Sequence, residues 1–286
     1  PAASLEYVGT FVWTGDDDSF GGFSGIEISP DGTGFHALTD RAHLYWGSID
    51  RDSQGVIRAM NIGGRAHLKD RQGVPLQPGY HGDSEGLAIG EDGRIWISFE
   101  GLNRIALYED PDAVPSRRRL PPELPWMRLN SGMEAIAIRG DTVFAVPERS
   151  GQEGDPFPIL TFRDNQWGQA GEIRRDPRWL AVGADFGPDG WFYLLERDFR
   201  GILGFASRVR RIWATSSAPT LSHSLCMRCS RMSSTRIGWN VPAPTCRVTW
   251  PNCTPRSRRR VSSASSKCRP AVGAATAPTS RANTVW

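Results

Sequence analysis

The stretch of sequence that decides the fold runs from Asp83 to Glu100 and reads DSEGLAIGEDGRIWISFE. It consists of an apolar run, an Asp-Gly turn at residues 92–93, and a second apolar run, with carboxylates at both ends. An Asp-Gly pair between two β-prone runs is the strongest short-range signal for a β-hairpin. Because the second run is continuously apolar at Ile95-Trp96-Ile97, we expect strands that are covered on both faces.

The same pattern recurs in three other segments of the chain. They are residues 24–41 (SGIEISPDGTGFHALTDR), 134–149 (EAIAIRGDTVFAVPER) and 185–197 (DFGPDGWFYLLER). A hairpin every fifty or so residues, with further strand-like material between the hairpins, is typical of the four-stranded blade of a β-propeller. We therefore predict an all-β propeller with about four recognisable blades. The alternative is a plain β-sandwich in which the turns recur by coincidence.

The composition of the chain changes sharply near residue 206. All 31 acidic residues precede this point, so residues 1–206 have a net charge near −11, whereas residues 207–286 hold all 5 cysteines and have a net charge near +14. We divide the chain there into a propeller-like domain, 1–206, and a basic tail rich in Cys, Ser and Arg, 207–286.

Three interpretations of the tail are open. It could be a disordered basic arm, a weak zinc module at Cys226 and Cys229, or an out-of-frame translation of a G+C-rich gene. We favour the third interpretation, and we therefore assign the basic run at residues 258–260 no role in binding nucleic acid.

The sequence also bears on the location of the protein. No apolar run approaches the roughly 18 residues that would span a bilayer, so we expect no membrane span. The start PAASLEYVGTFVW is typical of a chain whose targeting segment has been removed, and equally of a cloning boundary. We expect a periplasmic or extracellular protein, and the sequence does not define its oligomeric state.

Each predicted hairpin places two end residues opposite each other. Opposite residues of an antiparallel pair have a constant index sum, which pairs Ser24 with Asp40, Glu85 with Glu100, Glu134 with Glu148, and Asp185 with Glu196. Two carboxylates about 5–6 Å apart repel each other by on the order of 3 kcal/mol at an effective dielectric constant near 20. The chain therefore needs a bound cation, nearby arginines or shared protons to compensate.

In a propeller, hairpins of this kind point the same way, so their ends converge on one rim of the central channel. The predicted acidic rim consists of Asp40, Glu85, Glu100, Glu134, Glu148, Asp185 and Glu196. The expected catalytic carboxylates are Glu85, Glu100, Glu134, Glu148 and Glu196. The expected ligands of a divalent cation are Asp40, Asp83, Glu85, Glu134 and Asp185. Oxygen ligands at this density favour Ca²⁺, or Mg²⁺, over a soft metal.

Four arginines are expected to bind an anionic substrate: Arg41, Arg104, Arg149 and Arg197. Three of them, Arg41, Arg149 and Arg197, directly follow an acid. The alternative is therefore that these three form structural ion pairs between blades.

Four motifs resemble the phytase-like family of bacterial exported proteins, which is described by an esterase-like activity of phytase. They are FGGFSGIEISPDGTGFHALTDR, DSEGLAIGEDGRIWISFEGLNRI, NSGMEAIAI followed by VPER, and PDGWFYLLERDF, in order over about residues 5–205. The resemblance implies a propeller-like fold, six-bladed in the family, and a hydrolase that acts on phosphoric or other esters. It places the family's acidic motif residues on Asp40, Glu85, Glu100, Glu134, Glu148 and Glu196.

The chain departs from the family after Ser207. The family continues with a further Glu-Gly hairpin and an Asp-rich segment, and neither has a counterpart here. We therefore expect the last blade or two to be missing, with an incomplete ring and an incomplete acidic rim.

Three functions are compatible with these residues. The favoured one is a metal-assisted hydrolase of a small phosphoric or carboxylic ester; the alternatives are a calcium-dependent lactonase-like propeller and a non-catalytic binding propeller whose acids are structural.

Overall fold

The computed structural model describes residues 7–116, 120–122, 124, 126, 132–201 and 204–212, together with the backbone of residues 225–228. The regular elements of this part of the chain are β-strands. Within it, no helix is long and apolar enough to cross a membrane.

The strands form four antiparallel sheets. The first sheet contains β1 (Phe23–Ile28), β2 (Gly34–Thr39), β3 (His43–Arg51) and β4 (Ile57–His67). The second contains β5 (Ser84–Ile89), β6 (Ile95–Phe99) and β7 (Arg104–Tyr108). The third contains β8 (Ala135–Arg139), β9 (Thr142–Val146), β10 (Phe157–Arg163) and β11 (Gln166–Ile173). The fourth contains β12 (Leu180–Phe186), β13 (Phe192–Phe199), β14 (Phe205–Ile212) and β15 (Leu225–Arg228).

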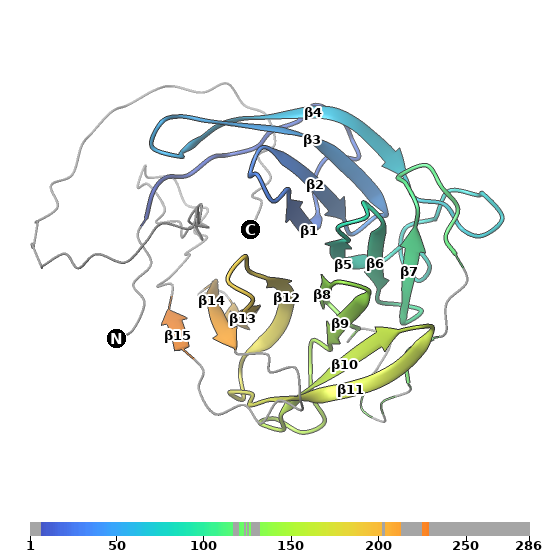
Figure 1. Ribbon diagram of the computed structural model, residues 1–286, viewed down its shortest axis with the longest axis vertical. Helices are drawn as coiled ribbons and strands as arrows, with labels where there is room; N and C mark the ends of the chain where they lie inside the picture. Colours follow the sequence, from blue (N-terminus) through green and yellow to red (C-terminus); the bar gives the residue numbers. More distant parts are fainter. Residues whose placement is uncertain are drawn as a thin grey trace, which may run out of the picture.

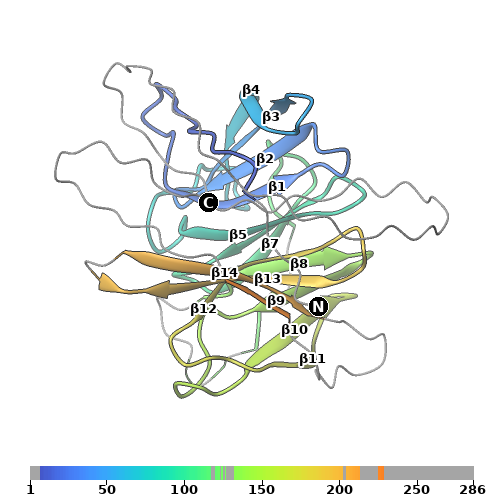
Figure 2. The same cartoon turned by 90° about the vertical axis from the view of Figure 1, so that its left-hand side faces the viewer.

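The sheets are arranged around a common centre. In each sheet the strands follow one another in chain order, and the first strand, β1, β5, β8 or β12, lies nearest the centre (Figure 1). A view from the side shows β3 and β4 at one end of the molecule and β11 at the other (Figure 2). This arrangement is that of a β-propeller, so the predicted fold class is confirmed.

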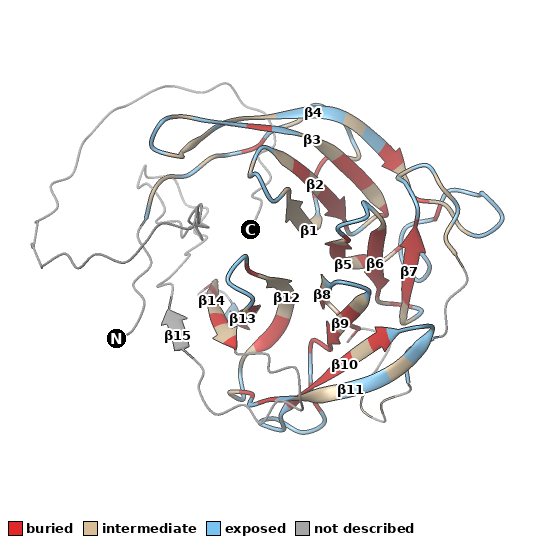
Figure 3. Cartoon of the chain, viewed as in Figure 1, coloured by how far each residue is buried: buried red, intermediate tan, exposed pale blue. Residues whose placement is uncertain are grey.

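Apolar layers between neighbouring sheets hold the propeller together. Leu38 and Leu44 of the first sheet pack with Leu87 and Ile97 of the second, and comparable layers join the second sheet to the third and the third to the fourth. Every residue of β6 is buried, as expected for a strand with a neighbouring sheet on each side. The outermost strands β4 and β11 carry most of the exposed positions (Figure 3).

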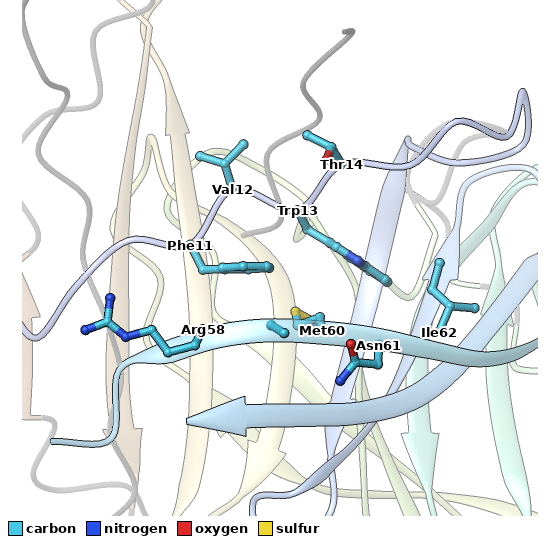
Figure 4. Close-up of a pocket in the computed structure, with 9 residues that line it drawn as sticks. Phe11, Val12, Trp13, Thr14, Arg58, Met60, Asn61 and Ile62 are labelled. Carbon is cyan, nitrogen blue, oxygen red and sulfur yellow. The ribbon is translucent and has the colours of Figure 1, made fainter. Parts of the chain in front are cut away.

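The free face of the first sheet is covered by the segment before β1. Trp13 and Phe20 are buried there against Phe35, and the rings of Trp13 and Phe20 meet edge to face with centroids 4.8 Å apart. Figure 4 shows Phe11 and Trp13 lying over β4, where they line a pocket of about 560 Å³. No acidic residue lines this pocket, so it is separate from the predicted rim.

The turns of the inner hairpins match the sequence prediction. Gly32, Gly93 and Gly190 have φ angles of 77°, 81° and 77°. Residues other than glycine rarely adopt such positive φ angles. The aspartate before Gly93 caps its turn, because its Oδ1 accepts a hydrogen bond of 3.0 Å from the backbone N–H of Arg94.

The register differs from the prediction in every hairpin. In the first three, Asp40, Glu100 and Glu148 bond to the backbone two residues before the predicted partner, so the predicted pairings with Ser24, Glu85 and Glu134 are wrong.

The register of the fourth hairpin also differs from the prediction. Asp185 lies opposite Tyr193, and Glu196 lies opposite Ala181, so the predicted pairing of Asp185 with Glu196 is wrong. The cause is the position of the turn: the backbone bonds between Gly187 and Trp191 close a loop that is centred on Asp189 rather than beside Gly190.

Regular structure continues past the composition boundary at residue 206. β14 crosses this position and pairs with β13 along its whole length. Buried and partly buried residues alternate along β14, and the buried ones include Arg208 and Arg210. Because arginine is polar, the hydropathy of the sequence does not show this alternation. Residues 213–224 and 229–286 lie outside the described residues, and the interpretation of the tail stays a prediction.

The buried arginines of β14 share one buried carboxylate. Glu196 is fully buried, and it accepts hydrogen bonds from Arg208 Nε at 2.6 Å and from Arg210 Nε and Nη2 at 2.7 and 2.9 Å. Arg208 also pairs with Asp176 and stacks over the ring of Trp179. Charge-assisted bonds of this kind fix the spacing of β13, β14 and the loop before β12.

We predict that Glu196→Gln lowers the free energy of unfolding by about 3–5 kcal/mol, because it leaves two buried guanidinium groups without their shared counter-ion. Urea denaturation measures this change. The control is Arg174→Gln. The side chain of Arg174 is 90% exposed, and its ion pair with Asp176 is long, at 3.8 Å, so this substitution should change the free energy of unfolding by no more than about 0.5 kcal/mol. Equal effects of the two substitutions would contradict the assigned role of Glu196.

Candidate metal centre

The backbone brings an acid to the same position in three hairpins. At the open end of each hairpin, the N–H of the acid donates to a carbonyl of the chain that leads into the inner strand. The three bonds are Asp40 to Gly22 at 2.7 Å, Glu100 to Asp83 at 2.8 Å, and Glu148 to Gly132 at 3.0 Å. The residue two places after each accepting carbonyl is Ser24, Glu85 or Glu134. Three hairpins therefore deliver Asp40, Asp83, Glu85, Glu100, Glu134 and Glu148 to one end of the propeller; we call these six residues the acidic cluster.

The fourth hairpin presents a different side chain at this position. Arg197 lies opposite Leu180, so it takes the place that Glu100 has in the second hairpin. Val182, two places after Leu180, takes the place of Glu85. The fourth sheet thus contributes a cation to the cluster where the other three contribute an anion.

Hydrogen bonds hold the first two sheets together beside the cluster. Ser84 Oγ donates to the carbonyl of Thr39 at 2.6 Å and accepts from the N–H of Ala42 at 3.0 Å. Ser24 Oγ donates to the carbonyl of Ser84 at 2.7 Å. Because Thr39 precedes Asp40 and Ser84 lies between Asp83 and Glu85, these bonds fix the spacing of the acids from the two sheets.

A glycine allows the second and third sheets to approach closely. A Cβ atom on Gly86 would lie 2.6 Å from the carbonyl oxygen of Glu134 and 2.6 Å from Ser98 Oγ. The N–H of Gly86 donates to Ser98 Oγ at 2.8 Å. Only glycine fits this position, and the close approach brings Glu85 toward Glu134.

Three carboxylates of the cluster meet closely enough to share a cation. One oxygen atom from each of Asp83, Glu85 and Glu100 lies within 4.8 Å of the others, and all three residues are partly buried. Glu100 Oε1 also accepts a hydrogen bond of 3.3 Å from the N–H of Gly132, which orients its carboxylate. We call these three residues the acidic triad.

Burial and mutual repulsion make the carboxyl groups hard to ionise. Burial, together with Asp83, Glu100 and Asp40, raises the pKa of Glu85 to about 8, although Arg197 opposes the shift. Burial, together with Glu148 and Glu85, raises the pKa of Glu134 to about 9. Burial also raises the pKa values of Asp40, Asp83 and Glu100.

Glu148 is held by two arginines. Arg149 Nε donates to Glu148 Oε2 at 2.9 Å, and Arg197 Nη2 lies 3.8 Å from Glu148 Oε1. Glu148 is buried, whereas the side chain of Arg149 is 53% exposed. Two of the four arginines predicted to bind substrate therefore contact Glu148.

The other two predicted arginines are bound to the backbone. Arg41 donates to the carbonyls of Asp18 and Gly21, and its Nε lies 3.5 Å from Asp40. Arg104 donates to the carbonyls of His81 and Leu102, and its guanidinium lies 3.7 Å from the centre of the Phe99 ring. These contacts use up hydrogen-bonding capacity that a substrate would need.

Two predicted members of the rim lie elsewhere. Glu196 points between β13 and β14 to its buried arginines, and it is not part of the cluster. Asp185 lies on β12, three residues nearer the turn than Val182. Burial raises the pKa of Asp185 to about 6. Burial, together with the charge of Asp185, raises the pKa of Glu27 on β1. Both corrections follow from the register of the fourth hairpin.

The sequence contained a signal for the place of Arg197. Alignment of the fourth segment on its Asp-Gly turn, rather than on its acids, pairs Asp189 with Asp92 and Arg197 with Glu100. The sequence prediction instead chose the alignment that kept acids opposite acids. Glu27 was not predicted at all, because it lies inside an apolar strand and outside the hairpin ends.

A protein-family model for phytase-like proteins, described as esterase-like activity of phytase, matches residues 18–226. The chain belongs to the phytase-like family. No curated protein matches the chain. The family match extends beyond the composition boundary at residue 206 and includes all of the acidic cluster.

Solved structures similar to this phytase-like chain are distant. A structure of U3-55K has a TM-score of 0.40 at 11% identity, with 73% of this chain and 53% of that one covered. An engineered GH43 glycoside hydrolase has a TM-score of 0.44 at 14% identity, with 68% and 38% covered. A protein of unknown function from Dyadobacter fermentans has a TM-score of 0.42 at 13% identity, with 73% and 65% covered. The chain thus spans about half the length of the U3-55K structure.

We predict that the cation-free protein loses stability as the pH rises. A carboxyl group whose pKa is higher in the folded than in the unfolded state stabilises the fold below its unfolded pKa, and this contribution disappears as the pH rises through the folded pKa. With Glu85 near 8 and Glu134 near 9, the melting temperature in EDTA should fall by roughly 5–10 °C between pH 5 and pH 9.

Substitution of one acid tests the assignment of this pH dependence. Glu134→Gln should flatten the profile, whereas Glu172→Gln, at an exposed position of β11, should leave it unchanged. A melting temperature that rises over this pH range in EDTA, or a profile that Glu134→Gln does not alter, would contradict the prediction.

Proposed function

We propose that this phytase-like chain is a metal-assisted hydrolase of small phosphoric or other esters, with its reaction centre at the acidic cluster. The observation that carries the proposal is the acidic triad, in which Asp83, Glu85 and Glu100 bring carboxylate oxygens within 4.8 Å of one another. Partly buried carboxylates at this spacing cost free energy unless a cation or protons neutralise them.

The donor set fits a hard divalent cation. The three available ligand atoms are carboxylate oxygens, which suit Ca²⁺ or Mg²⁺, and they do not suit a soft metal. Asp40 and Glu134 flank the triad and would complete its oxygen surroundings. When bound, a divalent cation would polarise an ester oxygen and acidify a water molecule.

The chain's own residues supply the other requirements of hydrolysis. Glu134 lies beside the triad and forms no ion pair with an arginine within 4.0 Å in the described part of the chain, so it is placed to exchange a proton with the substrate or with water. Arg149, which Glu148 holds at 2.9 Å and which is 53% exposed, is placed to contact an anionic group of the substrate. Location outside the cytoplasm stays a prediction.

Hydrolysis assays on the full chain test the proposal. p-Nitrophenyl phosphate and p-nitrophenyl acetate would be offered to protein treated with EDTA and then supplied with Ca²⁺, Mg²⁺ or Mn²⁺. We expect cation-dependent hydrolysis of at least one ester, and a loss of about 10²-fold or more in Glu85→Gln and Glu100→Gln. Glu172→Gln, outside the cluster, should keep the activity.

Two results would contradict the proposed hydrolase. Hydrolysis that survives both EDTA and Glu85→Gln would place the reaction elsewhere. A cation-dependent rise in melting temperature that Glu85→Gln abolishes, without hydrolysis of any ester, would identify a binding propeller with a metal site.

A further inference from the structure

One residue at the same end of the propeller as the acidic cluster carries the opposite charge. Asp40, Glu100 and Glu148 occupy one position in three successive hairpins, and Arg197 occupies that position in the fourth. Because backbone pairing fixes the position, the side chain of Arg197 is directed to the same end of the propeller as the carboxylates.

Arg197 has its closest acidic contact, in the described part of the chain, with Glu148, which is not a member of the triad. Its Nη2 lies 3.8 Å from Glu148 Oε1, and its guanidinium is 5.8 Å from the centre of the Phe205 ring on β14. Its positive charge attracts both Glu85 and Glu134. Its Nε is buried and has no hydrogen-bond partner in the described part of the chain.

We propose that Arg197 is the built-in counter-ion of the acidic cluster and fills the place of a second divalent cation. The cluster then holds one exchangeable cation, at Asp83, Glu85 and Glu100, while Arg197 neutralises the side formed by Glu134 and Glu148. This inference rests on the proposed function for the site of the exchangeable cation. Arg197 acts here as a positioning residue, because it sets where and how many cations bind.

The alternative is a pair of cations bridged by shared carboxylates, as in hydrolases that use two metals about 3.5–4 Å apart. Six carboxyl groups are enough to hold two cations. A guanidinium 3.8 Å from Glu148 would repel a cation bound on that side, and a fixed charge on the protein requires no ion from solution. The position of Arg197 therefore favours a single exchangeable cation.

Titration of Mn²⁺ and of Ca²⁺ into the full chain by calorimetry tests the proposal. Wild type should bind one cation per chain, and Arg197→Lys, which keeps the charge, should behave similarly. Arg197→Gln should bind on the order of tenfold more tightly, because a nearby repelling charge has been removed. Arg197→Glu, which restores the acid found in the other hairpins, should bind two cations per chain.

The control is Arg178→Gln. Arg178 lies in the turn before β12, pairs with Asp198 at 3.2 Å and is 64% exposed, so wild-type binding is expected. Circular dichroism with cation present checks that each variant is folded. If Arg197→Glu does not fold, the affinity of Arg197→Gln relative to Arg197→Lys still decides the question.

The outcomes separate this inference from the proposed function. Equal affinity and stoichiometry in wild type, Arg197→Gln and Arg197→Glu would overturn the inference and leave a one-cation hydrolase standing. Cation binding by Arg197→Glu but not by wild type would support the counter-ion role and contradict a metal-assisted reaction. Absence of binding in every variant would overturn both.

Discussion

Repulsion among six carboxyl groups is the constraint around which one end of this propeller is organised. Three hairpins with the same backbone pairing carry Asp40, Glu100 and Glu148 to equivalent positions, and the chain beside them adds Asp83, Glu85 and Glu134. The sheets cannot separate to relieve the repulsion, because apolar layers join them and because bonds such as that of Ser84 to Thr39 lie beside the acids. Free energy from burial of the apolar layers therefore offsets the cost of holding the acids together.

The structure offers three ways to reduce that cost, and Glu85 is open to two of them. Protonation serves the buried glutamates, since the pKa values of Glu85 and Glu134 lie near 8 and 9 without a cation. Guanidinium groups neutralise Glu148, which forms ion pairs with Arg149 and Arg197. A divalent cation would serve the acidic triad, whose oxygens are spaced for one. A site of this kind binds cations and protons in competition, which would make its chemistry depend on both pH and metal supply.

How well the site could be predicted from the sequence depended on how clearly the turn of each hairpin could be located. In the first three hairpins the turns fixed the register closely enough for Asp40, Glu85, Glu100, Glu134 and Glu148 to be predicted as one cluster, and the propeller followed from the spacing of the repeats. In the fourth, the nearly symmetrical acids Asp185 and Glu196 suggested a pairing that the turn centred on Asp189 does not allow. The role of Glu196 could not be predicted, because its partners Arg208 and Arg210 lie in a strand whose buried positions are charged.

Anomalous diffraction from crystals grown with Mn²⁺ tests the central claim most directly, because it locates the cation without reference to activity. The account predicts one strong peak at about 2.0–2.3 Å from carboxylate oxygens of Asp83, Glu85 and Glu100, and no second peak beside Glu148, where Arg197 lies. A peak between Glu27 and Asp185 instead, or the absence of any peak at the triad at saturating Mn²⁺ and pH 8, would contradict it.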